Sequence, residues 1–159
     1  MKTLVIGLGN PILGDDGVGW RVAEEVKRRL PPDSPVDVEC LSLGGISLME
    51  HLIGYQYAVL IDAFALDEPT GSILILKLDE LPNYSAYHTT SSHDTSLQNA
   101  IELGKSMGAD LPVDVTVVGI ATIRVHDFGE ELSPPVAEAV PLAVKFVLDM
   151  VGQKLAAEK

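Results

Sequence analysis

The apolar and polar positions of the chain follow two patterns that alternate along its length. Short, continuous apolar runs rich in β-branched residues are typical of strands that are buried on both faces of a sheet. These runs predict strands at 1–6, 36–43, 57–61, 72–78 and 113–120. Elsewhere apolar residues recur every three or four positions, as they do in an amphipathic helix. This spacing predicts helices at 18–30, 44–53, 93–107 and 133–151.

Strands that alternate with helices predict a single α/β domain over residues 1–159, with helices on both faces of the sheet. The turn at 67–71 is too short to contain a crossover helix. The fourth strand is therefore expected to run antiparallel to the third.

Two of the helices carry more specific signals at their ends. Ser133 precedes a pair of prolines and is expected to cap the last helix, whose first turn tolerates proline. Pro141 lies farther inside the same helix and is expected to kink or restart it. Ser92 or Asp94 is expected to cap the third helix.

The net charge of the chain indicates which classes of partner it can bind. A formal net charge of −12 and a sequence pI of about 4.5 argue against a nucleic-acid surface, which needs clustered Lys and Arg. This charge suits a partner with a basic tail, although many proteins are acidic for solubility alone. No apolar run has the length of a membrane span, and no signal-peptide pattern precedes the first strand. Because Cys40 is the single cysteine, no internal disulfide forms, and we expect a cytoplasmic protein.

The turn between the first strand and the first helix carries the candidate chemistry. Residues 7–19 read Gly-Leu-Gly-Asn-Pro-Ile-Leu-Gly-Asp-Asp-Gly-Val-Gly. Glycines let the backbone turn sharply and approach other groups closely, and such turns bind ligands in open α/β folds. The adjacent carboxylates Asp15 and Asp16 would disfavour a phosphate at this turn. The segment therefore predicts a site for a cation.

Three polar side chains occupy equivalent places in the predicted topology. Asp16 follows the first strand, Asp62 follows the third, and His93 enters the third helix. If the first and third strands are neighbours, both aspartates face the crevice at the carboxyl edge of the sheet. Two carboxylates and one imidazole suit zinc, iron(II) or nickel(II) with coordination positions left open. The same groups could instead perform acid–base chemistry on water.

Each of these residues also has a purely structural interpretation. Asp15 and Asp16 could cap the first helix, and Asp62 could cap a loop. His93 could lie at a helix terminus without taking part in any chemistry. The remaining side chains with ligand atoms are expected to be structural, at the surface or as a small core residue: His51, His88, His126 and Cys40.

The chain also resembles a known family. Residues 7–19 are similar to the signature G-x-G-N-x-L-x-x-D-[DE]-G-x-G of the nickel–iron hydrogenase maturation endopeptidases. Further similarities follow in order at 54–55, 61–63, 92–93, 118–120 and 129–136. Carried over residue by residue, the resemblance implies that Asp16, Asp62 and His93 are both the metal ligands and the catalytic residues.

The resemblance implies an activity and a fold. Members of the family are aspartic-type endopeptidases that remove the C-terminal extension of a hydrogenase large-subunit precursor after nickel insertion. The nickel is expected to arrive with the precursor, although other divalent metals could occupy the same ligands, and no organic cofactor is implied. The implied fold is a three-layer α/β/α domain, of a phosphorylase/hydrolase-like type, that acts as a monomer. Its five-stranded mixed sheet has the order 2-1-3-5-4, with strand 4 antiparallel.

The chain departs from the family pattern before the second helix. Residues 40–45 read Cys-Leu-Ser-Leu-Gly-Gly, where the family commonly has Asp-Gly-Gly-Thr-x-Gly. A carboxylate that could assist the chemistry is therefore missing, and Cys40 or Ser42 lies nearby.

Two other functions compete with the peptidase hypothesis. A metal-sensing escort that binds the precursor without cutting it would use the same residues. Peptidyl-tRNA hydrolases share the sequence at 7–11, but they have glycine at the position of Ile12 and a catalytic histidine near the position of Trp20. A dinucleotide-binding turn is also disfavoured, because the G-x-G-x-x-G pattern fails at Ile12.

Overall fold

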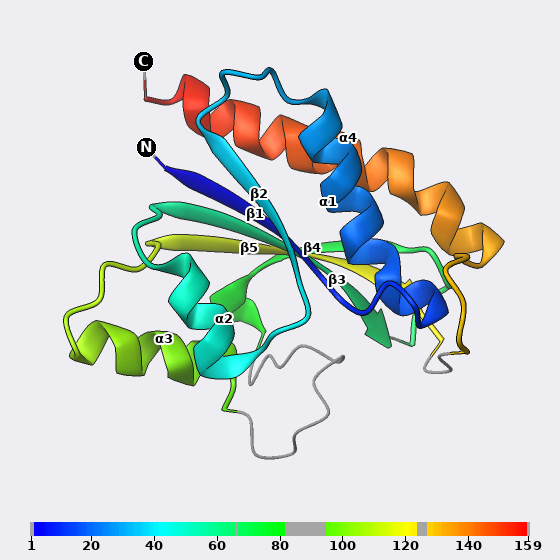
Figure 1. The fold of residues 1–159 in the computed structure, drawn as a ribbon, viewed down its shortest axis with the longest axis horizontal. Coiled ribbons are helices and arrows are strands. Elements are labelled where there is room, and N and C mark those ends of the chain that lie inside the picture. The colour runs from blue at the N-terminus through cyan, green and yellow to red at the C-terminus, as the bar shows by residue number, and fades with distance from the viewer. Residues whose placement is uncertain (1, 66, 82–94, 124–126, 159) are drawn as a thin grey trace.

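The computed structural model describes residues 2–65, 67–81, 95–123 and 127–158, and these form a five-stranded mixed sheet covered by helices (Figure 1). The sheet has the order β2-β1-β3-β5-β4. Its strands are β1 (Thr3–Leu8), β2 (Val36–Leu41), β3 (Tyr57–Ala65), β4 (Ile73–Lys77) and β5 (Asp114–Thr122). Neighbouring strands are parallel except for β4, which pairs antiparallel with β5. The predicted order and the direction of the fourth strand are confirmed.

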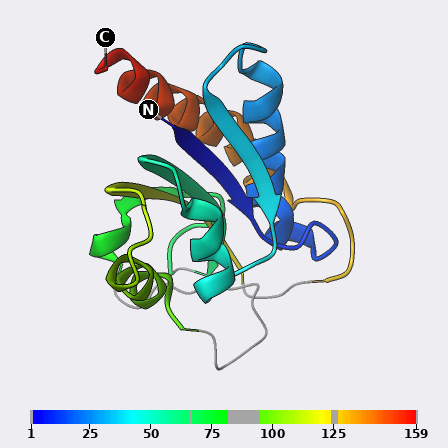
Figure 2. The same cartoon turned by 60° about the vertical axis from the view of Figure 1, so that its left-hand side comes forward.

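Helices cover both faces of this sheet (Figures 1 and 2). They are α1 (Val18–Arg29), α2 (Gly45–Leu52), α3 (Leu97–Ser106) and α4 (Pro134–Ala156), with short 3-10 turns η1 (Gly14–Gly17) and η2 (Leu78–Glu80). Buried residues of α1 and α4 form one apolar core with the sheet, and those of α2 and α3 form a second core on the opposite face. The three-layer α/β/α architecture is therefore confirmed.

The two cores explain the continuous apolar runs of the central strands. In β1, Leu4 and Ile6 belong to the core beneath α2 and α3, whereas Val5 belongs to the core beneath α1 and α4. In β3, Leu60 and Ile61 divide in the same way. Successive side chains of a strand point to opposite faces, so a strand covered on both sides needs apolar residues at every position.

Strand β3 is longer than the sequence predicts. Its pairing with β1 ends at Gly7 and Ile61, but its pairing with β5 continues through Asp62 and Gly119 to Ala65. Asp62 was expected directly after the strand, and it lies instead within it. The polar side chain interrupts the apolar run, but the backbone hydrogen bonds of the ladder continue past it.

The ends of the helices show three corrections. Helix α4 runs through Pro141 as one helix, because Val136 and Ala143 on either side are buried in the same core. Ser133 stands at its N-cap position, but its hydroxyl makes no capping bond. Helix α3 is capped by Ser96, whose hydroxyl accepts a hydrogen bond from the backbone N–H of Asn99 at 3.2 Å. The expected caps of α3, at 92 and 94, lie outside the described residues.

Helix α4 is the longest helix of the described chain, at 23 residues. Neither α4 nor any other helix within the described ranges combines the length and apolarity needed to cross a membrane.

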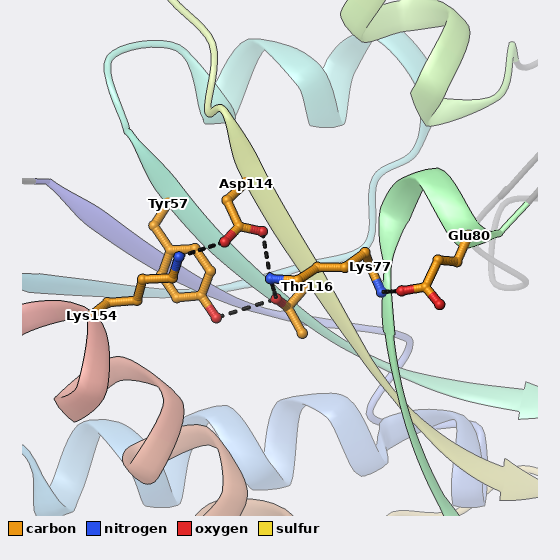
Figure 3. Close-up of polar contacts among 6 residues, drawn as sticks. All are labelled: Tyr57, Lys77, Glu80, Asp114, Thr116 and Lys154. Carbon is orange, nitrogen blue, oxygen red and sulfur yellow. Dashed lines mark hydrogen bonds and ion pairs between the residues drawn. The ribbon is translucent and has the colours of Figure 1, made fainter. Parts of the chain in front are cut away.

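A polar cluster ties β4, β5 and α4 together at the amino end of β5 (Figure 3). The Asp114 carboxylate accepts hydrogen bonds from Lys77 Nζ at 2.7 Å and from Lys154 Nζ at 2.6 Å. The Lys154 ammonium also lies 4.8 Å from the centroid of the Tyr57 ring. The Tyr57 hydroxyl in turn donates to Thr116 Oγ1 at 3.2 Å. The cluster fixes the last turns of α4 against the strand that lies next to the sheet edge.

The environment of Asp114 shifts its acidity. Burial alone would raise the pKa of this carboxyl, but the hydrogen bonds and charges of Lys154 and Lys77 outweigh burial and hold the pKa below its ordinary value. The hydrogen bond to Asp114 raises the pKa of Lys154. The carboxylate is therefore more stable as an anion in the folded protein than in the unfolded chain.

Replacing Asp114 by Asn should lower the free energy of unfolding at pH 7 by about 1 kcal/mol, the upper range for partly exposed ion pairs. Because the folded-state pKa is depressed, this contribution is present above the ordinary Asp pKa of about 3.9 and is lost as pH falls through the folded value. Urea denaturation of both proteins from pH 7 to pH 3 should show the difference narrowing below pH of about 4.

Asp149→Asn, at an exposed position of α4, the helix that carries Lys154, is the matched control and should have no comparable effect. A difference between Asp114→Asn and the original protein that stays constant with pH would contradict this assignment.

Candidate active site

The carboxylate of Asp16 is buried in η1 between the first strand and the first helix, with an exposed fraction of 1%. Its Oδ2 accepts a hydrogen bond from the backbone N–H of Asn10 at 2.9 Å. Its Oδ1 is also buried, and no hydrogen-bond partner for it exists among the described residues. Because a buried polar atom without a partner is costly, Oδ1 is the kind of atom that a ligand would satisfy.

Neither aspartate of the turn caps the first helix. The N-cap position of α1 is Gly17, and no side chain makes a capping bond there. Asp15 instead reaches the start of α4, where its carboxylate accepts from the backbone N–H of Ser133 at 2.6 Å and from the Ser133 hydroxyl at 2.7 Å. The structural interpretation of Asp15 and Asp16 as caps of α1 is therefore wrong.

Close backbone contacts explain the glycines on either side of Asp16. A Cβ on Gly19 would lie 2.3 Å from the carbonyl oxygen of Leu8 and 2.4 Å from that of Ile61. Only glycine lets α1 begin so close to the end of β1 and to Ile61, the last residue of β3 that pairs with β1. Gly9 has a φ of 140°, and a Cβ there would lie 1.9 Å from the Asp16 carbonyl oxygen. These contacts hold the η1 turn, and Asp16 with it, over the carboxyl edge of the sheet.

Asp62 is fully buried in β3. Its Oδ1 accepts a hydrogen bond from the backbone N–H of Ala63 at 2.9 Å. Strand alternation places Asp62 on the face that carries Leu60 and Phe64, beneath α2 and α3. Its register partner on β5 is Gly119, where a Cβ would lie 3.1 Å from the Phe64 ring. The absence of a side chain at 119 leaves space for the ring beside Asp62.

The structure brings Asp16 and Asp62 to the same edge of the sheet. Asp62 comes one residue after Ile61, the last residue of β3 that pairs with β1, and η1 packs against β3. Both carboxylates are buried at this edge, and their joint role in one site stays a prediction.

His93 lies outside the described residues, as do His88 and His126. Helix α3 precedes the parallel strand β5, so its N-terminus also lies toward the carboxyl edge. Thr95, two residues after His93, contacts the start of α2, because a Cβ on Gly45 would lie 3.0 Å from its carbonyl oxygen. No group of three His, Cys, Asp or Glu side chains in the described part of the chain is placed to hold a metal. The three-residue site therefore stays a prediction.

The residues at the divergent 40–45 segment support the turn and supply no carboxylate. The Ser42 hydroxyl donates a hydrogen bond to the carbonyl of Gly9. Trp20 Nε1 donates to the carbonyl of Leu41 at 3.0 Å. Burial raises the pKa of the Cys40 thiol to about 11, so the thiol is protonated at neutral pH. Cys40 is half-buried, so the expected core role is only partly met.

His51 makes a surface contact, as the sequence predicts. Its Nδ1 lies 3.0 Å from Glu39 Oε2, and both side chains are more than a third exposed. This contact joins α2 to β2 and does not involve Asp16 or Asp62.

The segment 127–133 is fixed to the turn after β1, a contact that the sequence does not reveal. Backbone hydrogen bonds of 2.8 Å join Gly129 N to the Ile12 carbonyl and Gly14 N to the Gly129 carbonyl. The Arg21 guanidinium of α1 donates to the carbonyl of Glu130 at 2.6 Å. Together with the Asp15–Ser133 bonds, these contacts hold the segment along its length.

The chain is similar in sequence and fold to known proteins. A sequence model of the family described as hydrogenase maturation protease matches residues 20–150. The hydrogenase expression/formation protein HupD of Thiocapsa roseopersicina is 28% identical over 152 residues, which is 96% of this chain and 68% of that protein. A hydrogenase maturating endopeptidase HybD from E. coli has a similar fold, with a TM-score of 0.79 at 24% identity, over 97% of this chain and 94% of that one. A hydrogenase 2 maturation peptidase from a Thaumarchaeota archaeon is 29% identical with a TM-score of 0.68, over 96% and 99% of the two chains.

Replacing Gly19 by Ala should lower the free energy of unfolding by about 2 kcal/mol or more, because the new methyl group meets two carbonyl oxygens that cannot move independently of the sheet. Urea denaturation measures the effect. Gly152→Ala in α4 is the matched control, since nothing lies within 4 Å of its Cβ position. That substitution should stabilise the helix by about 0.5–1 kcal/mol. Equal stability of the two variants would show that the contact at Gly19 is not close.

Proposed function

The chain belongs to the hydrogenase maturation protease family, a family of peptidases, and from this membership we propose that it removes the C-terminal extension of a nickel–iron hydrogenase large-subunit precursor after nickel insertion. The observation that supports a site for this reaction is the buried Oδ1 of Asp16. It lies at the carboxyl edge of the sheet, at the same edge as the buried carboxylate of Asp62.

The nickel in this proposal belongs to the substrate. Asp16, Asp62 and His93 would contact the metal that the precursor carries, and carboxylate and imidazole donors suit nickel(II). Asp16 Oδ1 has no hydrogen-bond partner among the described residues, which supports this role because an incoming cation would satisfy it. A precursor without nickel would leave these desolvated groups unpaired, so the loaded precursor is expected to bind more tightly.

The two aspartates also supply a proton acceptor for peptide hydrolysis. Water adds to the scissile carbonyl carbon while a carboxylate takes its proton, and the proton then goes to the leaving amine as the C–N bond breaks. Asp16 and Asp62 both lie out of contact with bulk water, where a carboxylate oxygen holds a defined orientation. In this scheme the metal contact selects the loaded precursor and one carboxylate performs the proton transfer.

Replacing Asp62 or Asp16 by Asn, or His93 by Ala, should reduce release of the C-terminal peptide by at least about 100-fold, the scale expected when a group used in general acid–base catalysis is removed. Mass spectrometry of nickel-loaded and nickel-free precursor incubated with each protein measures the released peptide. The controls are His51→Ala and Asp149→Asn, which change a surface histidine and a surface carboxylate of the described chain and should cleave normally.

Four outcomes of this experiment separate the alternatives. Cleavage of the loaded precursor alone supports both the peptidase activity and recognition of the metal. Cleavage of both forms by the original protein would overturn metal recognition. Binding of the loaded precursor without any peptide release would favour the non-cleaving escort, and full activity of the Asp62→Asn protein would overturn the site.

A further inference from the structure

The exposed side chains of the segment 127–133 form one wall of a groove beside the candidate active site. The groove has a volume of about 920 Å³, and its lining includes Gly14 and Asp15 of the η1 turn. Asp15 is the residue next to Asp16 in the sequence, so the groove borders the η1 turn that carries Asp16. We call this feature the acidic groove and define it by five exposed residues of its lining: Ile123, Asp127, Phe128, Glu130 and Glu131.

Two large apolar side chains of the acidic groove are exposed. Phe128 is 87% exposed and Ile123 is 64% exposed. Ile12, whose carbonyl bonds to Gly129, adds a third apolar side chain at 49%. Exposed aromatic residues are costly to maintain in water, and where they group together they often mark a surface that a partner covers.

The backbone that presents Phe128 is held before any partner arrives. Gly129, its neighbour, exchanges hydrogen bonds with Ile12 and Gly14, and Glu130 is held by Arg21. A side chain on a fixed backbone loses little conformational freedom when it becomes buried in an interface. Phe128 therefore has the properties of a binding hot spot.

The charge of the acidic groove selects the chemistry of its partner. Asp127, Glu130 and Glu131 are exposed, and no lysine or arginine is part of its described lining. The carboxylate of Asp15 is already bonded to Ser133 and adds no free anion. With a net charge of −12, the protein as a whole also attracts cationic partners.

We propose that the acidic groove binds a segment of the precursor polypeptide that carries an apolar residue next to lysine or arginine residues. This inference rests on the proposed function and deepens it, because it assigns a docking surface separate from the candidate catalytic residues. The apolar residue packs on Phe128 and Ile123, and the basic residues face the three carboxylates. Since the groove and Asp16 share the η1 turn, a segment bound there leads the chain toward the site.

The test compares Phe128→Ala and the double variant Glu130→Lys/Glu131→Lys with matched controls. Met107→Ala removes an apolar side chain of similar exposure, 78%, at the end of α3. Asp33→Lys/Asp110→Lys reverses two exposed carboxylates near the opposite edge of the sheet. Thermal unfolding of all variants verifies that each is folded.

Peptide release from the loaded precursor gives kcat and KM, and surface plasmon resonance gives the association rate with the precursor. Phe128→Ala should raise KM by about 10-fold or more and leave kcat within about 2-fold, since it weakens docking and not the chemical step. The double reversal should slow association by about 10-fold at low salt, and the difference should disappear at high salt. The controls should match the original protein in both measurements.

The failures of the two proposals can be told apart. If the original protein neither cleaves nor binds any loaded precursor, the proposed function is wrong and this inference falls with it. If the original protein cleaves but the groove variants keep its KM and association rate, only the acidic groove is wrong. A fall in kcat without a change in KM would likewise overturn docking, because it would place Phe128 in the chemical step.

Discussion

The first helix contacts the sheet backbone to backbone, and the arrangement of the candidate site depends on this contact. Gly19 lies so close to the carbonyls of Leu8 and Ile61 that no side chain fits there. This contact sets how near the start of α1 comes to the end of β1 and to the middle of β3. The η1 turn, which directly precedes α1, therefore lies over the carboxyl edge of the sheet, and Asp16 is buried there. Side-chain packing of α1 against α4 then secures an approach that the glycines make possible.

The two aspartates meet different structural requirements. Asp16 lies in a turn and keeps one oxygen without a partner in the described chain. Asp62 lies inside a strand, where its backbone continues the ladder with β5 and its side chain bonds to Ala63. A buried carboxylate in a central strand contributes no apolar contacts to the cores of the sheet. Its presence is more readily explained by chemistry than by stability.

Much of this fold could be predicted from the sequence, because the patterns that specify it are local. Continuous apolar runs identified the buried strands, and the segment 7–19 identified the turn that carries Asp16. The predicted end of β3, at Ile61, is wrong. Its ladder with β5 continues to Ala65, and the register with a partner so far along the chain is not revealed by any local pattern. Helix α4 does not restart at Pro141, because buried neighbours in the core outweigh the lost backbone hydrogen bond.

The candidate site was predicted less completely for the same physical reason. Asp16 and Asp62 could be assigned to one edge of the sheet, because adjacent parallel strands place their carboxyl ends together. Asp15 was misjudged, since its partner Ser133 is 118 positions away and a capping preference considers only the nearest helix. His93 lies outside the described residues, so its part in the site is still a prediction.

The bond between Asp15 and Ser133 also has a consequence for how the protein is made. It joins Asp15 to a residue that the ribosome adds 118 positions later. Contacts of such long sequence separation form late, because the intervening chain must first be ordered. The wall beside Asp16 therefore takes its shape only when the last helix is present. A nascent chain that has not yet reached Ser133 lacks this contact, and with it the wall beside the η1 turn.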